Sequence, residues 1–413
     1  MKKDFYIVLA GQIISLFGNA VLRFALPLYL LNETGSAALF GVVSACSFLP
    51  MILLSPVGGI LADRLNKRNI MVALDFGMAV LVTVFQLMLG RMNLIALLLI
   101  MMILLYAIQG TYQPVVQASV PVLVQAKQLM QGNALVNLVQ SLSGLAGPVA
   151  GGALYSFFGI RPILVISAVC FLGASIMELF LHIPYTKNKS TEGLWKTGMR
   201  DIRESFSFMR DTCPEIMKVS LILSGFNLVL STCIIIGLPV VITRHLGYSA
   251  AVGNRMYGYM EGIMGAGGLT GGILAGPLAR KMKPQDITKI VAACAFLLLP
   301  VGSGFLFGMS SSVIYLIMAV CNFLMMLMAA LASILVMSYL QIITPNEILG
   351  KVISCAMCVI MLAQPLGQAI YGILFQKFGG TPQYIFFLSA AATAFVAWLS
   401  GKPFEKIEAL LAA

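Results

Sequence analysis

Residues 59–68 read GILADRLNKR, a short polar and basic turn between two long apolar segments. The segment before the turn, 37–62, and the segment after it, 70–90, each supply the roughly 20 apolar residues that a helix needs to cross a bilayer. Basic residues between two spans favour the cytoplasmic surface of a membrane. The stretch therefore predicts a pair of membrane-spanning helices joined by a tight cytoplasmic turn.

The whole chain has the composition of a protein whose solvent is lipid. Of its 413 residues, 60% are hydrophobic and only 10% are charged, whereas soluble domains carry about 25% charged residues. Backbone polar groups in lipid must pair within the protein, which leaves helices or closed barrels. Barrel strands alternate apolar and polar residues, but residues 94–105 form an unbroken apolar run. We therefore predict an all-α membrane protein.

Twelve apolar segments are long enough to span the membrane, six on each side of the most polar stretch of the chain. We predict transmembrane helices at 5–31, 37–62, 70–90, 94–120, 132–158, 161–184, 215–243, 254–279, 287–309, 312–342, 350–378 and 382–403.

The net charge of +11 is unevenly distributed. In the twelve-helix arrangement, most of the 26 Lys and Arg residues fall on one side of the membrane, which is typical of the cytoplasmic face. This asymmetry argues against nucleic acid as a partner. Together with Lys2 and Lys3 at the start and an even number of spans, it predicts a multi-pass cell (inner) membrane protein with both termini in the cytoplasm.

The two halves of the chain repeat each other. The sequence GILA at 59–62 returns at 272–275, and Gly147-Pro148 matches 365–367 at nearly the same offset. Such internal repeats indicate duplication and two bundles of the same orientation. We expect one six-helix bundle at 1–184 and another at 215–403.

Outside the two bundles, we expect a cytoplasmic linker at 185–214 and a cytoplasmic tail at 404–413. Within the linker, apolar residues recur at helical spacing, which is typical of an amphipathic helix on the membrane surface; they are Met199, Ile202, Phe206 and Met209. A solvated linker helix without membrane contact is the alternative.

The turn at 59–68 has the chemistry of a gate. Gly59 permits close approach of a neighbouring helix, and Asp63 can meet the positive end of a helix or a basic side chain. Arg64, Lys67 and Arg68 can pair across the boundary between the halves, and we expect Asp75 to brace them from the next span. The alternative is a charge cluster that only orients insertion.

This turn resembles the G-x-L-A-D-R-x-G-R-R loop of the major facilitator superfamily, which implies alternating access between two six-helix bundles. Asn66 stands where that family usually has Gly, and Asn also tolerates a left-handed backbone. Within the superfamily, the start of the chain resembles the macrolide-efflux and enterobactin-exporter branch; the residues that carry this resemblance are Gly11-Gln12, Ser15, Gly18-Asn19, Ala25-Leu26-Pro27 and Thr34-Gly35-Ser36.

The fifth predicted span contains Gly147-Pro148-Val149-Ala150-Gly151-Gly152, similar to the G-P-x-x-G-G core of exporters in this superfamily. Small residues allow backbone-to-backbone packing and Pro148 allows a bend. We expect the partner to be the glycine stripe Gly268, Gly272 and Gly276 of the eighth span. Generic helix packing is the alternative.

Charged residues inside spans cost about 2.5–3.5 kcal/mol each on insertion scales, so each needs a reason. Arg23 and Glu261 lie at similar depth, and Arg23 follows Asn19 by one turn of the same helix. We expect Glu261 to carry a proton, with Arg23 as its partner or as a substrate contact; the resembled branch commonly has Asp where Asn19 stands. The alternatives are a static ion pair and a hydrated Glu261. Glu178, near a span end, is expected to reach water.

Polar uncharged side chains in several spans could line a central cavity. Amides among aromatic residues and Met suit a bulky amphipathic ligand, although helix–helix hydrogen bonding is an equal alternative for each residue. The candidates are Tyr106, Gln109, Gln113, Asn137, Gln140, Asn227, Asn322 and Gln364.

No nucleotide-binding loop, catalytic triad or metal-ligand cluster is present in the sequence, so we expect no enzyme activity, cofactor or metal. A proton gains about 2.3 kcal/mol per 100 mV of membrane potential, enough to drive exchange. We predict a monomeric, proton-coupled exporter of an amphipathic drug-like, macrolide-like or siderophore-like compound. An importer of a small nutrient on the same fold is the alternative.

Overall fold

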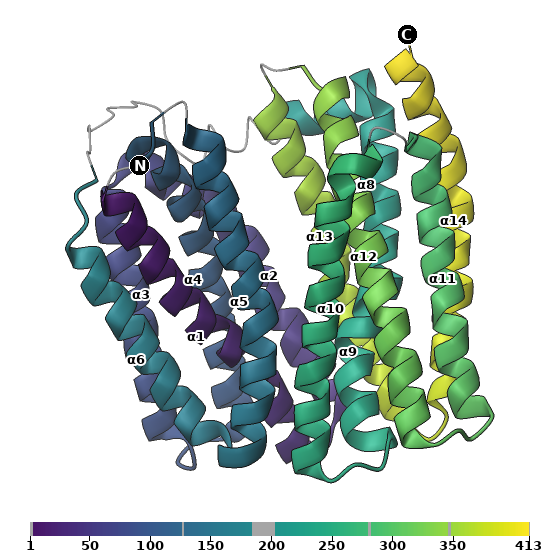
Figure 1. The fold of residues 1–413 in the computed structure, drawn as a ribbon, viewed down its shortest axis with the longest axis horizontal. Coiled ribbons are helices and arrows are strands. Elements are labelled where there is room, and N and C mark those ends of the chain that lie inside the picture. The colour runs from purple at the N-terminus through teal and green to yellow at the C-terminus, as the bar shows by residue number, and fades with distance from the viewer. Residues whose placement is uncertain (1–2, 126–127, 184–202, 280–281, 346–347, 413) are drawn as a thin grey trace. The chain divides into compact units, whose positions relative to one another are not determined.

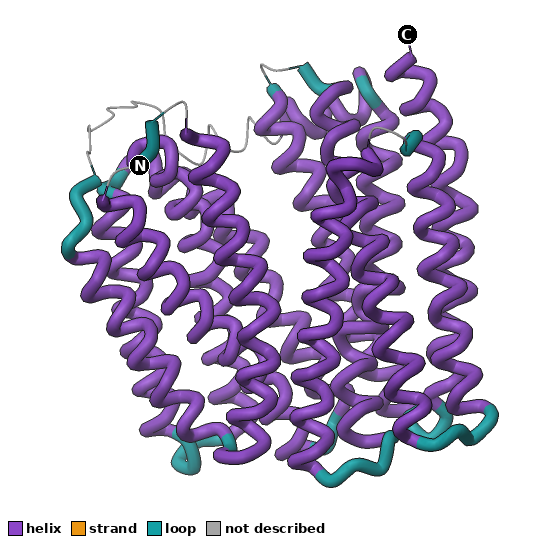
Figure 2. The backbone as a smooth tube through the Cα atoms, in the orientation of Figure 1, coloured by secondary structure: helices purple, strands orange, loops and turns teal. Residues whose placement is uncertain are grey.

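The computed structural model describes residues 3–125, 128–183, 203–279, 282–345 and 348–412 (Figure 1). Within these ranges every regular element is a helix, and Figure 2 shows the short loops that connect them. The prediction of an all-α fold is therefore confirmed. The chain divides into two compact units, one made of Met1–Ser190 with Tyr248–Gly262, the other of Thr191–Gly247 with Ile263–Ala413.

The first unit holds six long helices at nearly the predicted positions. They are α1 (Lys3–Thr34), α2 (Ala37–Arg64), α3 (Lys67–Met88), α4 (Leu94–Leu123), α5 (Leu129–Phe158) and α6 (Ile160–Leu179). Gly35, Gly90 and Gly159 have positive φ angles in the turns that connect them, a conformation that costs glycine nothing. The first half of α10, Tyr248–Gly262, belongs to this unit.

The described part of the second unit begins with helical residues 203–207, which continue into the short π-helical segment η2 (Phe208–Thr212). Its first span, Pro214–His245, is continuous but changes between α- and π-helical geometry. The elements are α8 (Pro214–Phe226), η3 (Asn227–Ser231), α9 (Thr232–Val240), η4 (Val241–His245), the second half of α10 (Ala250–Ala279), α11 (Pro284–Leu306), α12 (Ser311–Ile343), α13 (Leu349–Lys377) and α14 (Pro382–Ala412).

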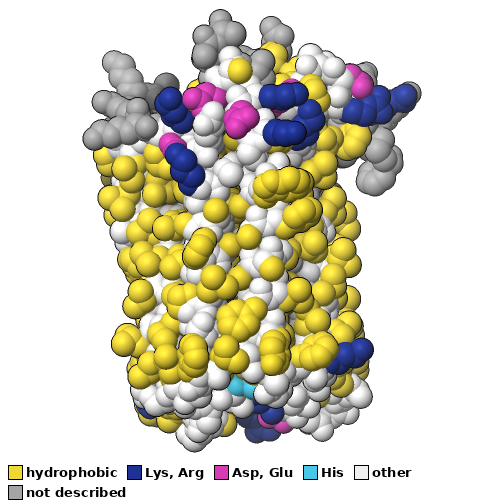
Figure 3. All heavy atoms as spheres, turned by 90° about the vertical axis from the view of Figure 1, so that its right-hand side faces the viewer, with side chains coloured by type: hydrophobic (Ala, Val, Ile, Leu, Met, Phe, Trp, Pro, Cys, Tyr) yellow, Lys and Arg dark blue, Asp and Glu magenta, His cyan; other side chains and the backbone are white. Residues whose placement is uncertain are grey.

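Eleven spans among the described residues are long and apolar enough to cross a membrane. The twelfth, α10, has 30 residues, but Arg255, Glu261 and many glycines lower its hydropathy. Large apolar side chains lie exposed on the helices, including Trp398 at 74% and Phe296 at 72%. In Figure 3, hydrophobic side chains cover the middle of one face, and charged side chains gather mainly at its upper end. Such a surface suits lipid rather than water.

Each unit has its own apolar core. In the first, Phe5, Met71 and Val116 join α1, α3 and α4. In the second, Val219, Leu335 and other buried residues join α8, α11, α12, α13 and α14. Because each bundle buries its own apolar side chains, each has an independent source of packing stability.

Two segments outside the predicted bundles also pack into the second unit. The predicted tail continues α14 as helix, with Phe404 and Ile407 buried, so it is not a loose extension. In the linker, Met209 is buried in the same core rather than facing a membrane surface, while Phe206 is exposed. Met199 and Ile202 lie outside the described residues.

Candidate functional site

The turn at 59–68 is shaped by a helix cap. The chain leaves α2 at Arg64, and Asn66 accepts a hydrogen bond from the Arg68 backbone N–H at 3.0 Å as the N-cap of α3. Its φ of −66° and ψ of 115° are extended, so the tolerance of Asn for a left-handed backbone is not used here. Asn serves here because its side chain satisfies a free backbone donor at the start of a helix.

The basic residues of the turn are not all free to pair elsewhere. The Arg68 guanidinium donates to the backbone carbonyl of Leu179, the last residue of α6. A cation at the C-terminal end of a helix is favourable because that end carries partial negative charge. Arg68 therefore ties the turn to its own unit. The side chain of Asp63 lies outside the described residues, and the gating role of Gly59, Arg64 and Lys67 stays a prediction.

Close helix packing occurs one residue before the predicted glycine. A Cβ at Gly58 would lie 2.5 Å from the Thr111 carbonyl oxygen of α4, whereas a Cβ at Gly59 would meet nothing within 4 Å. Gly110 of α4 approaches the Met51 backbone in the same way. Gly59 thus faces open space, and Gly58 and Gly110 hold α2 against α4.

The glycines of the fifth span pack against two helices. A Cβ at Gly147 would lie 2.3 Å from Ala20 Cβ, and one at Gly151 would lie 3.2 Å from Phe24, both on α1. A Cβ at Gly152 would lie 2.9 Å from the Cα of Gly258, in the first half of α10. Gly152 therefore permits backbone-to-backbone contact between α5 and α10.

The contact on α10 differs from the one expected. A Cβ added at Gly258 would lie 2.8 Å from the Pro148 carbonyl oxygen, so Gly258 packs against α5. Gly268, Gly272 and Gly276 would meet nothing within 4 Å, while Gly267 packs on the Phe323 backbone of α12. The expected stripe is wrong because helical spacing identifies a face of small residues but not the neighbour that each face meets.

Two charged residues of the first unit, Arg23 and Glu261, interact electrostatically but form no ion pair. The Arg23 guanidinium lies over the Tyr106 ring, 4.6 Å from its centroid. Glu261, partly buried on α10, interacts electrostatically with Arg23 and lies beside Tyr257. Tyr257 stacks on Phe24 at 4.8 Å between ring centroids. A carboxyl, a guanidinium and three aromatic rings therefore line one region of this unit.

Amide pairs extend this region along α4. Asn19 donates a hydrogen bond to Gln109, and Gln140 donates to Gln113 at 2.6 Å. Asn32 donates to Asn254 at 2.9 Å, a contact that the sequence did not indicate. Asn137 of α5 is exposed and joins none of these pairs.

The cavity candidates of the second unit are not gathered in the same way. Asn227 donates to the Ile360 carbonyl at 3.2 Å, and the buried Asn322 donates to the Met318 carbonyl at 2.8 Å within its own helix. Gln364 is partly buried on α13. The side-chain N–H group of Asn227 thus bonds to a neighbouring helix, and that of Asn322 bonds to the backbone of its own helix.

The structure corrects two expectations for acidic residues. Asp75 does not pair with the basic turn; it is 2% exposed and accepts a hydrogen bond from Ser15 at 2.8 Å. Glu178 does not reach water; it is 0% exposed and accepts from the Tyr112 hydroxyl at 2.8 Å. The sequence showed each residue near a span end but not which way its side chain turns.

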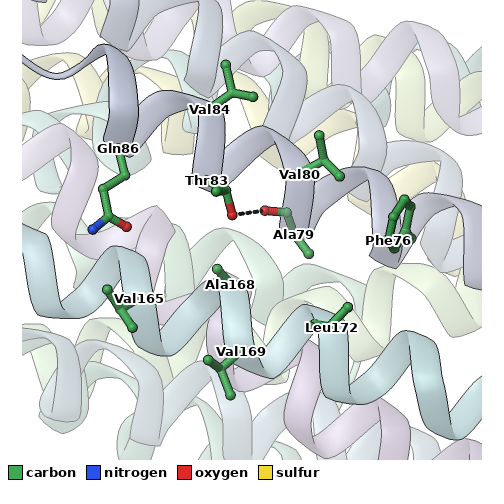
Figure 4. Close-up of a pocket in the computed structure, with 10 residues that line it drawn as sticks. All are labelled: Phe76, Ala79, Val80, Thr83, Val84, Gln86, Val165, Ala168, Val169 and Leu172. Carbon is green, nitrogen blue, oxygen red and sulfur yellow. Dashed lines mark hydrogen bonds between the residues drawn. The ribbon is translucent and has the colours of Figure 1, made fainter.

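An apolar crevice of about 410 Å³ lies between α3 and α6 (Figure 4). Its lining includes the exposed side chains of Phe76, Val80 and Val169, and none of the predicted cavity residues. The Thr83 hydroxyl points to the Ala79 carbonyl, 2.7 Å away, so it satisfies its own helix. A crevice of this composition suits an acyl chain of the surrounding lipid rather than a specific polar ligand.

Comparison with known proteins gives a consistent result. The model of the Major Facilitator Superfamily matches residues 8–341. Macrolide efflux protein A of Streptococcus pyogenes is 29% identical over 211 residues, 51% of this chain and 52% of that protein. The multidrug resistance protein MdtG of Salmonella paratyphi A is 27% identical over 285 residues, 66% of each chain. This chain thus spans about half the length of the first of these relatives.

A solved structure has the same fold. The bacterial homologue of the human lysosomal transporter Spinster, in its inward-facing and unoccupied conformation, superimposes with a TM-score of 0.73. The alignment covers 99% of both chains at 14% identity. At that identity the likeness concerns the fold alone.

Proposed function

Because the chain belongs to the Major Facilitator Superfamily, we propose that it is a secondary transporter that exports an amphipathic organic compound in exchange for protons. The names of its relatives support export, since one is a macrolide efflux protein and another a multidrug resistance protein. In this proposal the chain is a monomeric antiporter of the cell (inner) membrane, with both termini in the cytoplasm.

The observation that carries the proposal is that Glu261 lies within electrostatic reach of Arg23 in the first unit. Charges within spans are costly, so an Arg and a Glu at this depth need either each other or a ligand. Tyr106, over which Arg23 lies, adds an aromatic surface, and the amide pair Asn19–Gln109 adds hydrogen-bonding groups. This combination suits a bulky ligand with polar and aromatic parts.

Glu261 and Arg23 together supply an exchange chemistry. With Arg23 close, the positive charge favours the ionised form of Glu261. A substrate that places a basic or hydrogen-bond-donating group beside the ionised carboxylate competes with the proton for Glu261. Proton binding therefore favours release of the substrate, and substrate binding favours release of the proton, as an antiporter requires.

In this proposal, helices that contact each other through glycines move relative to one another during transport. Gly152 and Gly258 bring α5 and α10 into backbone contact, so these helices can slide without interlocked side chains. At the opposite end of α5, the turn at 59–68 acts as the cytoplasmic gate. The bond from Arg68 to the end of α6 keeps that turn in a fixed place on its own bundle.

Transport in everted membrane vesicles tests the proposal. With radiolabelled erythromycin as the probe, we expect an inward-acidic gradient to drive uptake, and dissipation of the gradient to abolish it. Vesicles that lack the protein are the control. Uptake that ignores the gradient would contradict proton exchange.

Whole-cell accumulation tests the direction. Deletion of the gene should raise the intracellular level of the probe in an exporter, and re-expression should lower it again. A lower level on deletion would favour the alternative, a proton-coupled importer.

A further inference from the structure

A second acidic cluster lies in the first unit, where four helices meet. Asp75 of α3 and Glu178 of α6 are 2% and 0% exposed. Ser15 of α1 donates to Asp75 Oδ1 at 2.8 Å, and the Tyr112 hydroxyl of α4 donates to Glu178 Oε1 at 2.8 Å. Ser15 and Tyr112 are themselves buried. The two carboxyls therefore sit in a closed pocket of hydroxyl groups.

No cation balances this cluster. Asp75 and Glu178 interact electrostatically with each other, and none of the described Lys, Arg or His side chains forms an ion pair with either. The guanidinium of Arg68 reaches the end of α6 but binds the backbone carbonyl of Leu179. Burying an uncompensated carboxylate costs several kcal/mol, and two like charges nearby add repulsion. The cluster requires a bound positive charge.

Several hydrogen-bonding atoms in the cluster have no partner. Asp75 Oδ2 and Glu178 Oε2 are buried and unpaired, as are both amide atoms of the fully buried Gln12. Gln12 lies one turn before Ser15 on the same face of α1. The adjacent Gly11 faces Glu178: a Cβ added at Gly11 would lie 3.8 Å from Glu178 Cγ. Unsatisfied buried polar atoms are rare, and here both carboxyls of the cluster have one.

We propose that Asp75 and Glu178 together bind one exchangeable proton, as a second proton site distinct from Glu261. The proton resides on Asp75 Oδ2 or Glu178 Oε2 and leaves one negative charge on the pair. Ser15 and Tyr112 donate hydrogen bonds to that charge, and the Gln12 amide can supply a third. On release, the proton passes to water and the pair carries two negative charges.

The site is separate along α1 from Arg23, the positive neighbour of Glu261. Ser15 and Arg23 are eight residues apart on α1, about 12 Å at a rise of ~1.5 Å per residue. Glu178 is the penultimate residue of α6, next to the Arg68–Leu179 contact. Phe5 and Leu181 belong to the apolar core beside Tyr112. A displacement of the α6 end would therefore admit water to the cluster without disturbing Arg23.

Infrared difference spectroscopy tests proton binding directly and needs no substrate. The purified Glu261→Gln variant, which lacks the other proposed proton site, is titrated in nanodiscs from alkaline pH down to about pH 6, where exposed carboxyls stay ionised, in a sodium-free choline buffer. In this background we expect a protonated-carboxyl band that titrates, shifts in D2O and corresponds to one carboxyl per molecule. The double variant Asp75→Asn/Glu178→Gln should lose it, and Glu33→Gln, which changes an exposed carboxyl of α1, should keep it.

Two further measurements keep the proposal falsifiable. Tyr112→Phe removes one donor and leaves both carboxyls, so it should shift the titration midpoint even if the double variant does not fold. Addition of Na⁺ should leave the band unchanged.

In the Glu261→Gln background, a band that is absent, that does not titrate, or that persists when Asp75→Asn/Glu178→Gln is added would overturn the proposal. So would an unchanged midpoint in Tyr112→Phe, or a band that Na⁺ displaces, which would indicate a metal cation instead. The proposal rests on the proposed function only for the use of the proton in transport. Loss of vesicle transport with an intact infrared titration would count against the proposed function alone.

Discussion

The two acidic sites of the first unit differ in what balances their charge. Glu261 is partly buried and has Arg23 as a positive neighbour. Asp75 and Glu178 are buried and accept hydrogen bonds from the Ser15 and Tyr112 hydroxyls, and no described cationic side chain forms an ion pair with them. A carboxyl beside a movable cation responds to whatever that cation binds, while a carboxyl pair without one responds to protons and water. The first arrangement suits exchange with substrate, and the second suits sensing the opening of a bundle.

Removing the cation from the first site should have the largest effect. Arg23→Gln leaves Glu261 without its positive neighbour, so we expect transport of erythromycin to fall to the background of vesicles without protein. Truncating one partner of a buried pair costs about 3–5 kcal/mol, and a partly exposed pair less.

The double variant Arg23→Gln/Glu261→Gln separates stability from transport. It should recover the thermal unfolding midpoint lost in the single variant, because no unbalanced charge remains, but it should not recover transport. Recovery of transport in the double variant would contradict the role of Glu261.

Adding a cation to the second site should make it resemble the first. Gln12→Lys places an ammonium one turn from Ser15, where it can pair with the Asp75 or Glu178 carboxylate. We expect the titrating infrared band of the pair to disappear because the ionised form is then stabilised. Gln12→Met has a similar length without charge and should retain the band; equal spectra for the two variants would argue against a charge effect.

Removing one hydroxyl should distinguish a carboxyl acceptor from a neutral one. Tyr112→Phe leaves a buried carboxyl oxygen without its donor, at a cost of about 1–3 kcal/mol of unfolding free energy. Tyr371→Phe in the second unit removes a hydroxyl contact with Ser389, which should cost about 0.5–1.5 kcal/mol. Thermal unfolding in detergent compares the two, and a smaller loss for Tyr112→Phe would contradict the account.

The smallest effect concerns the cap of the helix that carries Asp75. Asn66→Ala removes the hydrogen bond to the Arg68 N–H, and we expect a loss of about 1 kcal/mol. Asn66→Gly, which introduces the usual residue of the family, should cost only a few tenths of a kcal/mol. Equal losses for both would mean that the cap contributes little.

Most of the fold could be predicted because apolar length and basic turns are local properties. The segment boundaries at GILADRLNKR lie within a few residues of the ends of α2 and α3. The packing of the predicted tail could not be read from the sequence, because Phe404 and Ile407 are buried in a core that is formed by residues far away in the chain. The beginning of the linker helix falls on residues whose structure is not described.

The candidate site was only partly predictable, since helical spacing identifies a face but not its neighbour. The electrostatic interaction of Arg23 with Glu261 agrees with their similar depth in the sequence, whereas a role in proton coupling stays a prediction. Gly58 and Gly59 are indistinguishable in the sequence, yet only Gly58 meets α4. The Asp75–Glu178 pair was missed because its members belong to helices that are not consecutive, and each looked able to reach the membrane surface.

Substrate-dependent proton movement tests the central claim most directly. The protein is reconstituted in proteoliposomes that contain a pH-sensitive dye, and erythromycin is added outside. The account predicts that erythromycin moves protons in the opposite direction through the wild type, and that Glu261→Gln abolishes this movement while Glu33→Gln does not. Proton movement of wild-type size in Glu261→Gln, or erythromycin transport by the wild type without any proton movement, would contradict it.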